Sequence, residues 1–153
     1  IGPSDSSELG EAGSTCESHG ERGDDGVPRQ IIRPEGFTPN PILVPAVKFG
    51  DLVFTAGMVG HDPSTGQMVG SDIRTQGRQT MDNLQAALAA AGTSLDNALK
   101  VTAFVADLAD RPAFNEVYCE YFTGDPPART CIQGGSLGEG VLVEVEVVAC
   151  MPG

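Results

Sequence analysis

The apolar residues of the chain recur at two different periods, which predict strands and helices in alternation. Residues 42–49 alternate well enough for a strand, Gly50-Asp51 is typical of a turn, and residues 52–56 form the returning strand of a predicted β-hairpin. Residues 99–108 are rich in β-branched and aromatic side chains and predict a buried strand. The pair Pro126-Pro127 ends the segment before it, because proline restricts its own φ and the residue that precedes it. Two late strands are therefore predicted after it, one starting near Ala128 and one over residues 141–148.

Two segments instead show the three- and four-residue steps of helices. The first helix is predicted over residues 73–91, with Ser71 or Asp72 as N-cap and Gly92 as C-terminal stop. Its apolar stripe consists of Met81, Leu84, Ala87, Leu88 and Ala91. The second helix begins at Asp110 and runs to about Phe122. Its inward positions are predicted to be Phe114, Val117, Tyr118, Tyr121 and Phe122.

The resulting order β-β-α-β-α-β-β predicts an α+β fold, in which two helices pack on one face of a mixed sheet. The other face of such a sheet needs a cover, and the chain has no further element to supply it. We therefore expect copies of the chain to pack together through their sheets as a homo-oligomer.

Composition separates the chain into two parts. Residues 1–34 are rich in Ser, Gly, Glu and Asp and poor in large apolar residues, which predicts a disordered acidic leader before a domain over residues 35–153. The net charge of −12 argues against nucleic acid as a partner, because binding to phosphates depends on clustered Lys and Arg. No apolar run approaches the ~20 residues that span a bilayer, and no signal pattern begins the sequence. We therefore expect a cytoplasmic protein without a membrane partner.

The residues that commonly bind metals are scattered. The four cysteines, Cys16, Cys119, Cys131 and Cys150, form no C-x-x-C pair and have no histidine at ligand spacing, so neither a zinc site nor a disulfide framework is expected. His19 in the leader and His61 in a turn are expected to be exposed and without a role.

Arg129 and Glu144 are the residues that suggest chemistry. Arg129 places a permanent charge at the start of an apolar run, and Glu144 and Glu146 alternate with valines, so that both carboxylates share one face of the last strand. We expect Arg129 and Glu144 to lie on neighbouring strands and to form one polar site. The alternatives are a salt bridge to a nearby carboxylate for Arg129 and an ion pair between subunits for Glu144.

The motif Pro127-Ala128-Arg129, followed by an apolar pair, a Gly-rich linker and Val143-Glu144-Val145-Glu146, resembles the signature of the Rid family of imine deaminases, also called the YjgF family. The resemblance covers residues 41–149 and includes three other segments, 54–57, 81–92 and 100–108. It implies a chorismate-mutase-like homotrimer with a barrel-like packing of sheets and active sites between subunits. It also implies hydrolysis of 2-aminoacrylate-like enamines or imines to a 2-oxo acid and ammonia, without metal or organic cofactor.

By the same resemblance, Arg129 holds the substrate carboxylate as a bidentate fork and Glu144 positions or activates the attacking water. Asn115 and the backbones of Gly57 and Cys131 match positions that line the cleft. Asn115 could instead be a surface residue, Gly57 the end of a strand, and Cys131 a buried apolar thiol without a nucleophilic role.

Leu43 departs from the family pattern, since it occupies the place of a tyrosine that covers the pocket. Thr130 replaces a Ser or Ala, and the linker over residues 134–140 lacks the usual Leu-Pro. These differences imply a more apolar pocket and leave open a pathway-specific enzyme that acts on another imine. Two further hypotheses are a non-catalytic, regulatory trimer that binds small carboxylates, and a ribonuclease, which the acidic charge disfavours.

Overall fold

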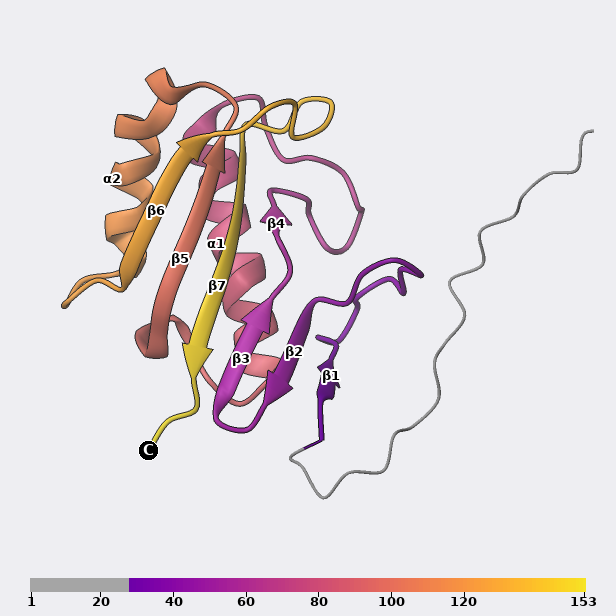
Figure 1. Cartoon of the computed structure of the whole chain (residues 1–153). Coiled ribbons are helices and arrows are strands. Elements are labelled where there is room, and N and C mark those ends of the chain that lie inside the picture. The colour runs from indigo at the N-terminus through magenta and orange to yellow at the C-terminus, as the bar shows by residue number, and fades with distance from the viewer. Residues whose placement is uncertain (1–27) are drawn as a thin grey trace, which may run out of the picture.

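The fold is a single curved sheet with two helices against one of its faces (Figure 1). The structure is a computed structural model, and it describes residues 28–153. The strands are β1 (Gln30–Ile32), β2 (Ala46–Phe49), β3 (Leu52–Thr55), β4 (Met58–Val59), β5 (Ala98–Val105), β6 (Ala128–Gln133) and β7 (Val143–Cys150). The helices are α1 (Ile73–Ala90) and α2 (Arg111–Tyr121), with 3₁₀ turns η1 (Leu95–Asn97) and η2 (Leu108–Asp110).

The strands follow the order β1-β2-β3-β7-β5-β6, and β4 also pairs with β7. The pair β5–β6 is parallel and the other pairs are antiparallel, so the predicted mixed sheet is confirmed. Helix α2 connects the two parallel strands, as a parallel connection requires a crossover. The predicted order of elements is confirmed, with β1, β4 and the two 3₁₀ turns in addition.

Alternation along β7 creates the core. Val143, Val145 and Val147 are fully buried against the helices, whereas Glu144 and Glu146 lie on the opposite face. From the helices, the predicted stripe of α1 and the α2 residues Phe114, Val117 and Tyr118 complete this core. Tyr121 and Phe122, also predicted to face inward, are only partly buried.

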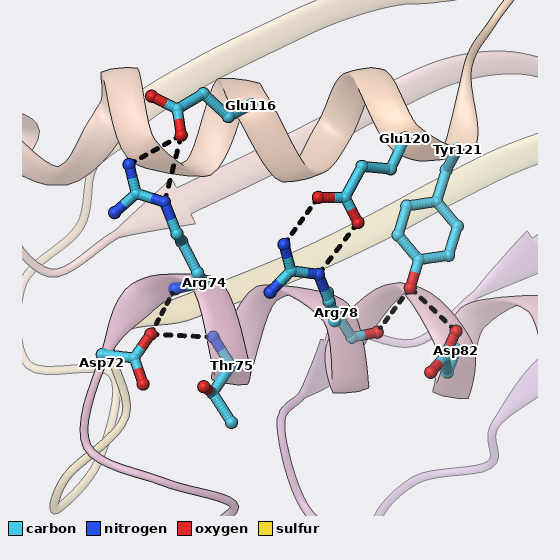
Figure 2. A network of polar contacts seen from close by, with 8 residues as sticks. All are labelled: Asp72, Arg74, Thr75, Arg78, Asp82, Glu116, Glu120 and Tyr121. Carbon is cyan, nitrogen blue, oxygen red and sulfur yellow. Dashed lines mark hydrogen bonds and ion pairs between the residues drawn. The ribbon is translucent and has the colours of Figure 1, made fainter.

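Polar contacts fix the start of α1 and its alignment with α2 (Figure 2). The Asp72 carboxylate accepts hydrogen bonds from the backbone N–H groups of Arg74 and Thr75, which confirms the N-cap. The Thr75 side chain above all, and then these backbone hydrogen bonds, lower the pKa of Asp72. Two exposed ion pairs then join the helices, Arg74 with Glu116 and Arg78 with Glu120.

Of the helices in residues 28–153, none is long and apolar enough to cross a membrane.

The sheet face away from the helices, here called the open face, is not covered by any helix or strand of residues 28–153. Its apolar side chains include Phe54, which is 43% exposed, and Ile132, which is 46% exposed. Between them lie polar side chains: Lys100 donates a hydrogen bond to the Thr130 hydroxyl at 2.7 Å, and Glu146 projects from the same face. A shallow cavity of about 110 Å³ opens among Phe54, Lys100 and Glu146.

The predicted start of the domain is wrong by a few residues. The predicted leader includes residues 30–32, but these form β1, which pairs antiparallel with β2 at the edge of the sheet. Gln30 and Ile31 are exposed there, and such a short edge strand has too few apolar residues to be recognised from its sequence. Residues 1–27, with Cys16 and His19, lie outside the described residues. The strand predicted from residue 42 begins only at Ala46, after a loop over residues 33–45 that contains four prolines.

Candidate functional site

Arg129 lies on the edge strand β6, and its side chain packs between that strand and α2. Its Cζ is 4.2 Å from the centre of the Tyr118 ring and 5.4 Å from that of Phe114. Its Nη1 donates a hydrogen bond of 2.7 Å to the Asn115 side-chain oxygen. The structure thus brings together two predicted site residues, Arg129 and Asn115. The alternative of a salt bridge is not what residues 28–153 form, since the polar partner of Arg129 is an amide.

The other edge of the Arg129 guanidinium is unused by the protein. Nε and Nη2 are buried and have no hydrogen-bond partner among residues 28–153. Buried charged donors without partners carry a large desolvation cost, so an anion that met them would be bound strongly. These two N–H groups form the side-on fork that matches the two oxygens of a carboxylate. Because both nitrogens are covered within the protomer, a ligand reaches them only after a local displacement of their surroundings.

Tyr118 completes the surroundings of this arginine. It is 5% exposed, and its hydroxyl also has no hydrogen-bond partner within the described part of the chain. Burial raises the pKa of Tyr118, and the nearby charge of Arg129 lowers it in part. The phenol is therefore neutral at physiological pH. We call Arg129, Asn115 and Tyr118 the Arg129 half-site.

Glu144 lies next to Gly57, on the open face of the sheet. A Cβ built on Gly57 would overlap the Glu144 carboxylate, so only a residue without a side chain permits this approach. The pairing of Met58 with Val145 and of Val59 with Glu144 holds the chain after Gly57 against β7. We call Glu144 and Gly57 the Glu144 half-site.

The two half-sites do not meet within one protomer, which corrects the prediction of neighbouring strands. Strand β5 lies between β6 and β7. Arg129 is in register with the buried Val101 and Val147 on the helix face, whereas Glu144 is in register with Phe104 and the exposed Ile132 on the open face. Two strand spacings across and three residues along separate their Cα atoms by about 14 Å. The order of strands, which local spacing does not determine, is the reason the prediction failed.

Cys131 and Leu43 complete the predicted set. Cys131 is a free cysteine two residues beyond Arg129 on the helix face, where its side chain packs partly buried against the core. That position suits the alternative of an apolar thiol. Leu43 is 43% exposed in the loop before β2, on the opposite side of the sheet from β6. It belongs with the part of the molecule that carries Gly57, since Ala56 donates its N–H to the Pro45 carbonyl at 2.8 Å.

Gln76 is a buried residue that the sequence analysis did not single out. Its amide donates to the Gly140 carbonyl at 2.8 Å, and its side-chain oxygen accepts from the Leu142 N–H at 2.9 Å. It thereby ties the Gly-rich linker and the start of β7, two residues before Glu144, to α1. Within residues 28–153, no three His, Cys, Asp or Glu side chains converge as a metal site would require.

Tyr118 was predicted only as a core residue. The available signal was its spacing: Asn115 and Tyr118 are three residues apart and share one face of α2. An amide oxygen accepts a hydrogen bond from the edge of a guanidinium, and an aromatic ring stacks on its plane. Both groups on one helix face opposite an arginine were therefore a usable signal.

Comparison with known proteins shows which family the chain resembles. The chain is 37% identical over 125 residues to the 3-aminoacrylate deaminase RutC of Acinetobacter baylyi, an alignment that covers 80% of this chain and 98% of the relative. It is 38% identical over 104 residues to the 2-iminobutanoate/2-iminopropanoate deaminase of Mus musculus, covering 68% and 77% of the two chains. The crystal structure of the YjgF gene product of E. coli superposes with a TM-score of 0.75 at 31% identity, over 80% of this chain and 99% of that one.

The family model described as Endoribonuclease L-PSP matches residues 37–151, which include both helices and every strand except β1. The predicted resemblance is confirmed: the chain belongs to the Endoribonuclease L-PSP family, also known as the Rid or YjgF family.

Proposed function

We propose that this protein is a hydrolytic deaminase of enamine or imine forms of small 2-amino acids, which releases a 2-oxo acid and ammonia. In this proposal the protein acts as a homotrimer, and each active site combines the Arg129 half-site of one protomer with the Glu144 half-site of the next. The proposal requires no metal and no organic cofactor.

The observation that carries the proposal is the unused side-on fork of Arg129. Nη1 is held by Asn115, whereas Nε and Nη2 have no partner among the described residues. A carboxylate is the planar ligand whose two oxygens match two parallel N–H donors. The substrates of a 2-imino acid deaminase all carry such a carboxylate next to the reacting carbon.

The separation of the half-sites supports an oligomeric site. A small substrate cannot touch both Arg129 and Glu144 in one protomer, because they lie on opposite faces of the sheet. The open face, which carries Glu144 and exposed apolar side chains such as Phe54, offers a second copy a surface to bury. The strand β6, which carries Arg129, ends the sheet with one side of its backbone unpaired by other strands.

The chemistry then needs few groups. Arg129 holds the carboxylate, so that the C=N carbon lies at a fixed distance from the adjacent half-site. Glu144 accepts a proton from water as the oxygen adds to that carbon, and it returns this proton to the imine nitrogen, which gives a carbinolamine. The hydroxyl proton of the carbinolamine then passes through Glu144 to the amino group, the C–N bond breaks, and ammonia leaves as the C=O of the 2-oxo acid forms. Two relatives named as deaminases, from Acinetobacter baylyi and Mus musculus, support this class of reaction.

A coupled assay tests the proposal. Threonine dehydratase generates 2-iminobutyrate in situ, and the release of 2-oxobutyrate is followed with and without the protein. We expect acceleration by the wild type and a loss of at least about a hundredfold in Arg129→Ala and Arg129→Lys, since lysine keeps the charge but not the fork. Wild-type turnover no faster than that of Arg129→Ala would contradict the proposal.

The second candidate function is a trimer that binds small carboxylates without catalysis. It is favoured by the fact that the Arg129 half-site contains a carboxylate anchor but no acid–base group within the same protomer. Calorimetry with 2-oxobutyrate separates the two candidates. Binding that depends on Arg129, together with no acceleration of imine hydrolysis, would identify the binding protein.

A further inference from the structure

We propose that Tyr118 is a positioning residue for Arg129: its ring fixes the plane of the guanidinium while Asn115 fixes which edge of it remains for the ligand. This inference rests on the proposed function, since it concerns the carboxylate anchor of the same site. It adds the selection of one binding edge by two residues of α2.

The plane of the guanidinium is set by stacking. The Cζ of Arg129 is 4.2 Å from the centre of the Tyr118 ring, well inside the range of about 6 Å for a cation–π contact. Phe114 lies at 5.4 Å from the same atom, and both rings are almost fully buried. Contact with these two rings restricts rotation of the Arg129 side chain. Within residues 28–153, no carboxylate forms an ion pair with it.

The edge is set by Asn115. A guanidinium can bind a carboxylate end-on through Nη1 and Nη2 or side-on through Nε and Nη2. Because Nη1 already donates to Asn115 at 2.7 Å, the end-on edge is partly occupied. The remaining pair, Nε and Nη2, is the one that lacks a partner among residues 28–153. The geometry thus selects side-on recognition of a planar carboxylate.

The ring of Tyr118, and not its hydroxyl, has the contact with Arg129. The hydroxyl is buried without a hydrogen-bond partner in the described part of the chain, so it holds neither the arginine nor the backbone. Replacement by phenylalanine therefore keeps the stack and removes a group that is costly to bury. Replacement by leucine removes the stack and keeps an apolar side chain. These two substitutions separate the ring from the hydroxyl.

The test measures binding and turnover in three variants with 2-oxobutyrate as the probe. We expect Tyr118→Leu to weaken binding, and to raise KM for 2-iminobutyrate, by about tenfold, with a smaller change in kcat, because stacking contributes to the anchor and not to the water. Tyr118→Phe should bind within about twofold of the wild type. Phe122→Leu is the matched control. The centre of the Phe122 ring is 4.5 Å from that of Tyr118, whereas the rings over Arg129 in the described residues are those of Phe114 and Tyr118.

A second variant and a spectroscopic signal keep the test decisive if Tyr118→Leu folds poorly. Asn115→Ala, on a half-buried position, should weaken 2-oxobutyrate binding to a similar extent. In addition, the ¹⁵Nε–H resonance of Arg129 should exchange slowly with water in the wild type and in Tyr118→Phe, and faster in Asn115→Ala.

Several results would overturn the inference. The first is wild-type affinity for 2-oxobutyrate in both Tyr118→Leu and Asn115→Ala. The second is a loss of affinity in Tyr118→Phe as large as that in Tyr118→Leu. The third is tighter binding by Tyr118→Leu, which would mean that the stack keeps the fork away from ligands. Absence of 2-oxobutyrate binding in the wild type would overturn it together with the anchor. Binding without deaminase turnover would instead contradict the proposed function alone.

Discussion

At the scale of single residues, Arg129 is held by partners that leave its Nε and Nη2 without a hydrogen bond among residues 28–153. A neighbouring carboxylate would neutralise it and occupy its fork, but its partners are an amide and two aromatic rings. Such partners restrict its orientation without cancelling its charge. The cost is that Nε and Nη2 stay buried without partners in the described protomer. These unpaired donors lower the free energy of unfolding, and a carboxylate bound to them would restore it.

Gly57 allows a test at the same scale. In Gly57→Ala the new methyl group would overlap the Glu144 carboxylate, which must then rotate away. We expect deaminase kcat to fall at least about tenfold while the thermal unfolding midpoint changes little, because the end of a flexible side chain gives way. Gly124→Ala is the matched control, since a Cβ there meets nothing within 4 Å. Unchanged kcat in Gly57→Ala would show that the position of Glu144 does not matter.

How far the residues could be predicted depends on the kind of evidence. Arg129 and Glu144 came from the residue pattern, and Asn115 and Gly57 from a family resemblance. Two contacts, Arg129 with Asn115 and Gly57 with Glu144, are present. The side of the sheet on which each residue lies was not predictable. Alternation along a strand gives relative faces within that strand, but comparing β6 with β7 requires the register across β5. Arg129 and Glu144 were therefore placed together wrongly.

At the scale of elements, the sequence predicted the helix ends and the hairpin turn, which depend on residues close together in the chain. Helix α1 ends within one residue of its predicted bounds, because the Asp72 cap and Gly92, at φ 88°, define its ends. The hairpin β2–β3 turns at Gly50 as expected, with φ 56°. The strand order was not predictable, since the last strand, β7, inserts between β3 and β5 through contacts distant in sequence.

Gln76 is the element-scale link between α1, the Gly-rich linker and β7, and it carries a second prediction. In Gln76→Leu the Gly140 carbonyl and the Leu142 N–H lose their partner in a region where Gln76 is fully buried. We expect a loss of about 1–3 kcal/mol in the free energy of unfolding, measured by urea denaturation. The control Gln79→Leu removes an amide that bonds only to Asn83 of the same helix, and should cost less. Equal costs would mean that the linker does not depend on Gln76.

At the scale of the whole molecule, the sheet separates the Arg129 half-site from the Glu144 half-site. The two helices cover one face of the sheet (Figure 1). That face forms the core and holds Arg129 at one edge, whereas the open face carries Glu144 and exposed apolar side chains. A fold of this kind leaves each protomer with both parts of a site in positions that do not meet. In the proposed trimer, burial of the open face and completion of the site would occur together.

Mixing two inactive variants tests this arrangement directly. In a homotrimer with each site shared by two protomers, Arg129→Ala and Glu144→Gln each lack one half-site in every interface. Random reassembly of equal amounts after reversible denaturation should restore about a quarter of wild-type deaminase activity, because one interface in four then joins an intact Arg129 to an intact Glu144. As a control, Glu144→Gln mixed with the double variant contains no intact interface and should stay inactive. If the mixture of single variants is no more active than its separate components, although native mass spectrometry shows mixed trimers, each site belongs to one protomer and the shared site is wrong.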